Sequence, residues 1–318
     1  MRWEPRPGTV VVALGGNALA PPGGRATIAD QFRHTRESLG AVIELARANW
    51  NIAIVHGNGP QVGDELERNE LAREWVEPLP LGVLVAATAG WIGYMIQQSL
   101  QNALERAGIR REVLTVITQT VVNAPHEAGP TGLKPVGHAL SPEQVKLLRE
   151  RGVSVGQDSE GRWRRMAPSP EPRAIVEAAA VRELVSQGKI VIAAGGGGPP
   201  VYRDPVLLWE GVDAVVDKDL AAAILGRSLE ADTLLILTDV DAVYRDWGSE
   251  RRSPIRRMAV GEAEELLAGD QLGTGSMKPK VEAAVRFVKG GGERAVIAHL
   301  AQGPAALRGE TGTTILRG

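Results

Sequence analysis

Cysteine is absent from this chain, and lysine and aromatic residues are scarce. Only 7 of the 36 basic residues are lysine, and aromatic residues make up 4% of the 318 positions. Without cysteine the protein can form no disulfide, thiolate nucleophile or cysteine-based zinc site. The five histidines never lie four residues apart, so the helical spacing of a paired-histidine metal site is missing too.

The charge and the hydrophobic pattern of the sequence exclude further classes of protein. The net charge is −2 and no block of like charges occurs, so we expect no nucleic-acid partner. The apolar segment near residues 81–89 is interrupted by Gly82 and Thr88, so we expect no membrane span, and the N-terminus lacks the apolar core of a signal peptide. With 43% hydrophobic residues, we expect a cytoplasmic, globular protein with ample core.

Glycine, by contrast, is abundant, and one stretch is dense in it. The apolar run Ile190–Ala194 predicts a buried strand, and it leads directly into Gly195, Gly196, Gly197 and Gly198. Residues without a Cβ let backbone N–H groups approach an anion at the carboxyl edge of a parallel sheet. Taken alone, the stretch is equally compatible with a simple glycine hinge.

The segment Asp217-Lys218-Asp219 follows, just before a predicted helix. A lysine near a helix N-terminus adds its charge to the helix dipole and so favours an anionic ligand. The alternative interpretation is an ordinary charged helix cap. Lysines are rare here, and those at 134, 218, 278 and 280 lie in loops or at helix starts, where a compact ammonium suits a phosphoryl group.

Two further strands end in glycine loops. The run Thr9–Leu14 is followed by Gly15, Gly16 and Asn17, and the run Asn51–Val55 by His56-Gly57-Asn58-Gly59. The carboxyl ends of parallel strands share one edge of a sheet, so we expect these loops to meet there and form the site. Alternating strands and helices predict a doubly wound α/β fold.

The segment 119–172 has little periodicity and contains Lys134, so we expect a lid or small subdomain, although a solvated loop lysine is the simpler reading. A long apolar helix is predicted over 81–107. Its face with Leu84, Ala87, Trp91 and Tyr94 is expected to form a homodimer contact, the alternative being burial within the chain.

Several nucleotide-binding and catalytic motifs are missing. The chain contains neither a Walker A loop nor a Gly-x-Ser-x-Gly elbow, and Gly57–Gly63 is only a weak match to a dinucleotide fingerprint. After these exclusions, the sequence still contains glycine loops that suit anions and are expected to face one another, together with isolated lysines and an aspartate. That combination fits phosphoryl transfer by positioning and charge stabilisation.

Seven segments in collinear order together resemble the carbamate kinases of the amino-acid kinase superfamily. They are Val11–Ala18 (VVALGGNA), His56–Gly63 (HGNGPQVG), Lys134–Gly137 (KPVG), Trp163–Pro170 (WRRMAPSP), Gly195–Gly198, Val216–Asp219 (VDKD) and Gly275–Ala284 (GSMKPKVEAA). Many superfamily relatives carry a lysine where this chain has Ala13, and in carbamate kinases Lys134 is thought to substitute. The family pattern predicts Pro and an aromatic where His138-Ala139 stands.

The resemblance implies a three-layer αβα sandwich with a mostly parallel central sheet. A lobe over 1–211 would take carbamate and carry a lid at about 119–172, and a lobe over 212–318 would bind nucleotide. The implied reaction is reversible transfer between ATP and carbamate, giving ADP and carbamoyl phosphate. Mg²⁺ would be held through the nucleotide phosphates, without protein ligands. The resemblance also implies a homodimer and a role in arginine metabolism.

The resemblance also assigns residues. Catalytic roles fall to Lys134, Lys218, Asp219 and Lys280. Carbamate and phosphoryl oxygens would be bound by Gly15, Gly16, Asn17, Gly57, Asn58, Gly59, Gly195, Gly196, Gly197 and Gly198. The nucleotide would contact Lys218, Thr238, Asp239, Val240, Tyr244, Gly275, Met277 and Lys280. Two alternatives stay open: another small-acid or phosphate kinase of the superfamily, or a catalytically silent ligand-binding regulator of the same fold.

Overall fold

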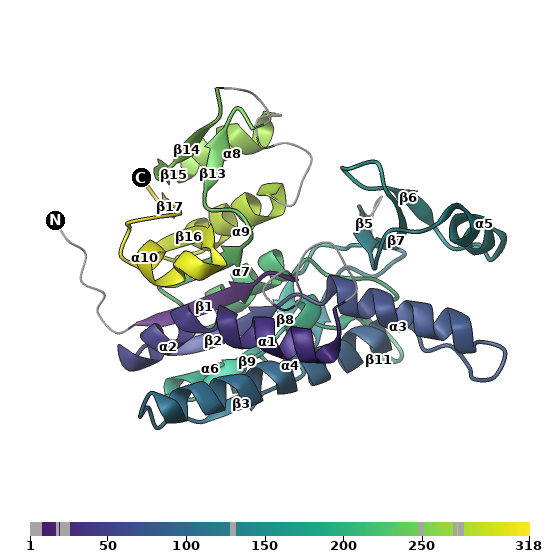
Figure 1. Cartoon of the computed structure of the whole chain (residues 1–318), viewed down its shortest axis with the longest axis horizontal. Helices are drawn as coiled ribbons and strands as arrows, with labels where there is room; N and C mark the ends of the chain where they lie inside the picture. The colour runs from purple at the N-terminus through teal and green to yellow at the C-terminus, as the bar shows by residue number, and fades with distance from the viewer. Residues whose placement is uncertain are drawn as a thin grey trace.

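An eight-stranded sheet forms the centre of the computed structural model, which describes residues 8–16, 19, 26–127, 132–247, 251–269, 272 and 277–318. The strand order is β15-β17-β16-β12-β1-β2-β9-β3 (Figure 1). All neighbours pair in parallel except β16 and β17, so the predicted mostly parallel sheet is confirmed. The strands are β1 (Thr9–Leu14), β2 (Asn51–His56), β3 (Val113–Thr115), β9 (Ile190–Ile192), β12 (Thr233–Thr238), β15 (Arg257–Ala259), β16 (Arg294–His299) and β17 (Thr313–Leu316).

Helices cover both faces of this sheet, which explains why its strands are continuous apolar runs. Along β1, Val10, Val12 and Leu14 belong to one core, whereas Val11 and Ala13 belong to the other. The first core includes α2 (Gly40–Arg47), α4 (Leu81–Arg106) and α10 (Gly303–Leu307). The second includes α6 (Ala178–Ser186), α7 (Lys218–Ser228), α8 (Val260–Ala268) and α9 (Met277–Lys289). The chain is therefore a three-layer αβα sandwich.

The carboxyl ends of three central strands lie level with one another. Leu14 pairs with His56 of β2 and with Leu237 of β12. The backbone N–H of Gly57 donates to Leu14 O, and that of Gly15 donates to Leu237 O, both at 3.0 Å. The glycine loops after β1 and β2 therefore begin at one edge of the sheet, as the sequence predicts.

A small subdomain is inserted before β9. It holds a three-stranded antiparallel sheet, β5 (Leu133–Val136), β7 (Trp163–Pro168) and β6 (Val155–Gln157), together with α5 (Pro142–Glu150). In Figure 1 it projects from the body on the side of α3 (Gly59–Ala72). The insertion is narrower than the predicted 119–172. Its predicted first residues form β4 (Thr120–Val121), which pairs with β10 (Pro200–Asp204) and β8 (Ala174–Ile175) in a sheet that also contains β11 (Leu208–Gly211).

The two predicted lobes would share one sheet, because β1 pairs directly with β12. The predicted boundary at residue 211 falls between β11 and α7. The remaining elements are α1 (Ile28–Ser38), the β13 (Val243–Arg245) and β14 (Ser253–Ile255) hairpin, and the short 3₁₀ helices η2 (Gly195–Gly197) and η4 (Leu300–Gln302). No helix in the described ranges combines the length and apolarity needed to cross a membrane.

The predicted contact face of α4 needs one correction. Leu84 is only 2% exposed and packs against α3 in the core, because its position on the helix points inward. Tyr94 is 56% exposed and Ala87 is also exposed, whereas Trp91 is partly buried. The exposed apolar stripe therefore runs through Val83 instead of Leu84.

Candidate functional site

The loop after β9 interlocks with the loop after β2. Ala194 has φ 49°, and Gly196, Gly197 and Gly198 have φ 68°, 89° and 79°. A Cβ at Gly196 would lie 2.3 Å from Nδ2 of Asn58, so no larger residue fits. Asn58 is held in turn by donating to Oγ1 of Thr88 at 2.9 Å. The glycine run thus lets two loops of the sheet edge touch.

Gly57 makes room for a lysine from another element. A Cβ at this position would lie 3.1 Å from Cδ of Lys218, at the start of α7. The aliphatic stem of Lys218 therefore passes close over the Gly57 backbone. This close approach brings the α7 N-terminus to the carboxyl ends of β1 and β2.

Asp217 caps α7 and fixes the direction of the residues that follow. Its Oδ1 accepts from the backbone N–H groups of Asp219 at 2.8 Å and Leu220 at 3.3 Å. Such a cap satisfies backbone donors that have no partner within the helix. Because the first turn is fixed, Lys218 and Asp219 have defined orientations.

One buried carboxylate organises two lysines. Asp219 is 2% exposed; its Oδ1 pairs with Lys218, and its Oδ2 lies 3.4 Å from Nζ of Lys280. Lys280 is 6% exposed and lies in the first turn of α9, which begins at Met277. Two ammonium groups from two helices therefore meet around a single carboxylate.

The third lysine comes from the inserted subdomain. Lys134 on β5 donates from Nζ to Oδ2 of Asp217 at 2.6 Å. Its side chain is 40% exposed, compared with 11% for Lys218. Lys134 is thus the most accessible of the three ammonium groups, and the subdomain supplies it to the sheet edge.

These groups line one cavity of about 220 Å³. All four predicted catalytic residues border it, as do Gly16, Gly57, Asn58, Gly59 and Gly196. Gly15, Gly195, Gly197 and Gly198 are not part of its lining. A Cβ at Gly197 would lie 2.4 Å from Val216 O and one at Gly198 2.4 Å from Oγ1 of Thr120, so these two glycines serve packing. Asn17 and Gly275 lie outside the described residues.

Asp217 also lines the cavity, and its role was missed by the sequence analysis. Burial would raise the pKa of this carboxyl, but Lys134 and Lys218 hold it well below its usual range. Burial lowers the pKa of Lys218, although attraction to Asp219 opposes the shift. With three lysines and two aspartates, the cavity carries one excess positive charge and suits an anionic group.

The amino acid kinase family model matches residues 8–299. The chain belongs to this family. It is 43% identical to the carbamate kinase of Pyrococcus horikoshii over 97% of this chain and 99% of that protein. Two solved structures of Giardia lamblia carbamate kinase are similar. The one bound to citric acid has a TM-score of 0.90 at 33% identity and 98% coverage of both chains. The one bound to AMP-PNP has a TM-score of 0.87 at 32% identity, again covering 98% of both chains.

Of the predicted nucleotide-binding residues that the structure describes, only Lys218 and Lys280 line the lysine cavity. Thr238 ends β12, with Asp239 and Val240 next, and Met277 begins α9. Tyr244 on β13 donates to Oδ1 of Asp241 at 2.9 Å, and this hydrogen bond raises the tyrosine pKa.

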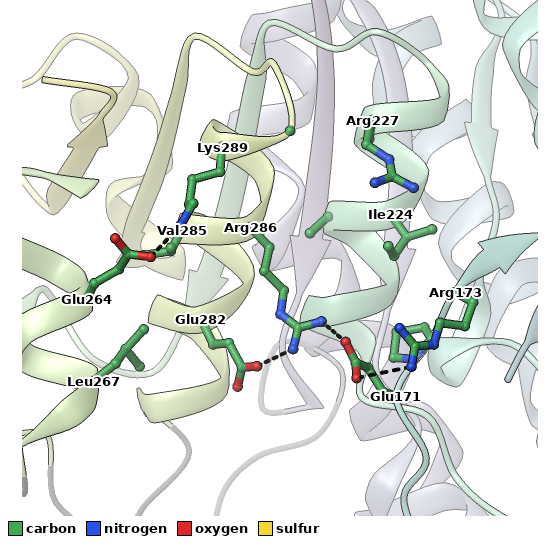
Figure 2. A pocket seen from close by; sticks show the side chains of 13 residues that line it. Glu171, Arg173, Ile224, Arg227, Glu264, Leu267, Glu282, Val285, Arg286 and Lys289 are labelled. Carbon is green, nitrogen blue, oxygen red and sulfur yellow. Dashed lines mark hydrogen bonds and ion pairs between the residues drawn. The ribbon is translucent and has the colours of Figure 1, made fainter. Parts of the chain in front are cut away.

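A larger cavity, of about 790 Å³, lies elsewhere on the molecule, between α7, α9 and residues 171–173 (Figure 2). Its charged side chains mostly neutralise one another. Arg286 pairs with Glu282 and Glu171, and Lys289 pairs with Glu264 at 2.6 Å (Figure 2). None of the predicted site residues lines it, so its size does not make it the reaction site. Among the described residues, no group of three or more histidine, aspartate or glutamate side chains could hold a metal ion.

Proposed function

We propose that this protein is a carbamate kinase, which transfers a phosphoryl group reversibly between ATP and carbamate and yields ADP and carbamoyl phosphate. Near-full-length similarity to proteins named carbamate kinase supports this function. The observation that carries it is the cavity of about 220 Å³ where three lysines from three elements surround the glycine loops.

In this proposal the three lysines stabilise the transferring phosphoryl group. Its equatorial oxygens carry the charge of the transition state, so preorganised cations around them lower the barrier without a covalent intermediate. Lys218 and Lys280 are held by the two oxygens of Asp219, and Lys134 is held by Asp217. The ammonium groups need little reorganisation during the reaction.

The acceptor would bind against Gly16, Gly57, Asn58 and Gly59, which line the cavity. Asn17 belongs to the same proposed subsite. A carbamate oxygen would attack the terminal phosphorus of ATP in line with the leaving ADP. The small volume favours an acceptor of carbamate size over a longer amino acid.

The nucleotide would bind in the lobe formed by residues 212–318. It would contact Thr238, Asp239, Val240, Tyr244, Gly275 and Met277. AMP-PNP bound to the Giardia lamblia relative supports a nucleotide site in this fold. We propose that Mg²⁺ enters with the nucleotide and is held by its phosphates, where it would neutralise charge on the β- and γ-groups.

We further propose a homodimer in the cytoplasm, with a role in arginine metabolism. The dimer would form through the exposed stripe of α4, which carries Val83, Ala87, Trp91 and Tyr94. Val83 is 47% exposed, Tyr94 is 56% exposed, and nearby Ile117 is 51% exposed. An apolar stripe of this kind on a long helix is typical of a surface that another subunit covers.

Acceptor choice tests the proposed function. ADP formation from ATP and Mg²⁺ would be followed with bicarbonate plus ammonium as the source of carbamate, and with acetate or glutamate in its place. We expect ADP only when bicarbonate and ammonium are both present. Equal rates with another acid would identify a different small-acid kinase. Nucleotide binding without turnover on any acceptor would identify a silent regulator.

A further inference from the structure

Glu70, on the outer half of α3, is the meeting point of two arginines from the inserted subdomain. Its Oε2 lies 2.6 Å from Nη1 of Arg151, just after α5, and its Oε1 lies 3.3 Å from Nη1 of Arg165 on β7. Arg73, the residue that follows α3, also reaches Oε2, at 3.3 Å. The side chains of Glu70, Arg151 and Arg165 are 21%, 27% and 25% exposed.

Nearer the N-terminus of α3 the contact is held by Gly137, whose backbone N–H donates to Gly59 O at 3.3 Å, and by His138, whose Nε2 lies 2.9 Å from Oδ1 of Asp64. Toward Glu70 it is loosely packed. A cavity of about 410 Å³ separates α3 from the subdomain and is walled by Leu66, Leu140 and Leu148. Apolar contact across it is limited to a small cluster, in which Val136 and Ala167 of the subdomain meet α3 and α4. An interface that contains a void loses packing contacts, so polar links have a larger share in holding it closed. The ion pairs of Glu70 are therefore the polar links that hold the outer part of the subdomain against α3, beyond the Gly137 and His138 contacts.

The base of the subdomain is anchored separately. The backbone N–H of Val215 donates to Pro168 O at 2.9 Å, where β7 ends. Three residues later Glu171 pairs with Arg286 of α9 (Figure 2). The chain is thus fixed at the base, and Glu70 makes its contacts farther along the subdomain.

A short path joins Glu70 to Lys134. Arg165 lies directly opposite Val136 in the β5–β7 pair, and Lys134 lies opposite Ala167, one pleat away. Movement of β7 away from α3 must therefore carry β5 with it. The ammonium of Lys134 would then leave Asp217 and the cavity.

We infer that Glu70 is a positioning residue, which holds the inserted subdomain closed through Arg151 and Arg165 and thereby keeps Lys134 at the reaction site. This inference rests on the proposed function for its effect on turnover. Its structural part stands independently, because closure can be measured without any substrate. Glu70 itself borders the cavity of about 410 Å³ and not the lysine cavity.

The test is Glu70→Gln, which removes the charge and keeps the shape. Ion pairs with this exposure are each worth about two- to fivefold in an equilibrium, so losing two pairs lowers the closed-to-open ratio about fourfold to twenty-fivefold, and kcat should fall with the closed fraction, by up to that factor. Added salt should lower wild-type turnover toward that of the variant, because it screens the same pairs. The matched control is Glu74→Gln, in the turn just after α3 and in the same cavity lining, which should leave kcat unchanged.

Hydrogen exchange without substrate gives the second readout. In Glu70→Gln the amides of β5 and β7 should exchange faster, whereas those of β1 and β12 should not change. Arg151→Gln removes a partner from the subdomain side and should give the same pattern if Glu70→Gln folds poorly. If β5 and β7 of a folded variant exchange at the same rate as in the wild-type protein, the inference is wrong. This outcome does not depend on whether the protein uses carbamate. Wild-type kcat with faster exchange would overturn the link to Lys134.

Discussion

Nζ of Lys134 lies 2.6 Å from Oδ2 of Asp217, and this ion pair joins the inserted subdomain to the N-cap of α7. The same carboxylate therefore orients two lysines by different means. It pairs directly with Lys134, and through the helix cap it fixes the first turn that carries Lys218. Closure of the subdomain and order at the start of α7 are coupled through one side chain.

Two variants of Asp217 separate these effects. Asp217→Asn keeps a good N-cap and removes the charge, so we expect turnover to fall at least tenfold with little change in stability. Asp217→Ala also removes the cap and should cost about 1 kcal/mol more in the free energy of unfolding. Urea unfolding and turnover of both variants check this. Equal stability of the two would show that Asp217 does not act as a cap.

Lys218 is expected to be essential for turnover. Removing one preorganised charge partner typically costs about 3 to 4 kcal/mol, so Lys218→Ala should lower kcat at least a hundredfold. Lys278 offers a matched control, because it lies in the first turn of α9 beside Lys280 but is exposed and does not line the cavity. Lys278→Ala should retain turnover. A folded Lys218→Ala protein with near-normal kcat would remove Lys218 from the mechanism.

His56 should make stability depend on pH. Burial lowers the pKa of its imidazole from 6.5 to about 4. Between these values the unfolded chain binds the proton and the folded chain does not, so stability is complete above pH 6.5 and falls as the pH drops toward 4. From pH 7 to pH 5 this loss is about 2 kcal/mol. His56→Gln should reduce the difference in unfolding free energy between these pH values by that amount. An unchanged pH dependence would contradict the burial of a neutral imidazole.

The proposed dimer face predicts the effect of a charge on α4. Tyr94→Glu would place a carboxylate in the exposed stripe, where dimer formation would bury it without a partner, and should dissociate the dimer. Sedimentation at micromolar concentration would then show a 33.8 kDa species in place of a dimer of twice that mass. A wild-type protein that sediments at 33.8 kDa would contradict the dimer. A variant that stays dimeric would move the interface to another surface.

The sheet and its glycine loops could be predicted because apolar strands buried on both faces leave a clear pattern, as in β1. Lys218 and Asp219 could be singled out because they start a helix. The partner of Lys134 could not be predicted, because the inserted segment has no periodicity from which the direction of the Lys134 side chain follows. Nor could the sequence distinguish Gly196, which lines the cavity, from Gly197 and Gly198, which pack behind it. That difference depends on contacts with Asn58, Val216 and Thr120, which are distant in sequence.

The central claim is tested most directly by ATP formation from carbamoyl phosphate and ADP in the presence of Mg²⁺. Luciferase detection would follow ATP with the wild-type protein and with Lys218→Ala. We expect ATP formation that requires both substrates and falls at least a hundredfold in the variant. No ATP formation by the folded wild-type protein, or equal rates for the two proteins, would contradict it.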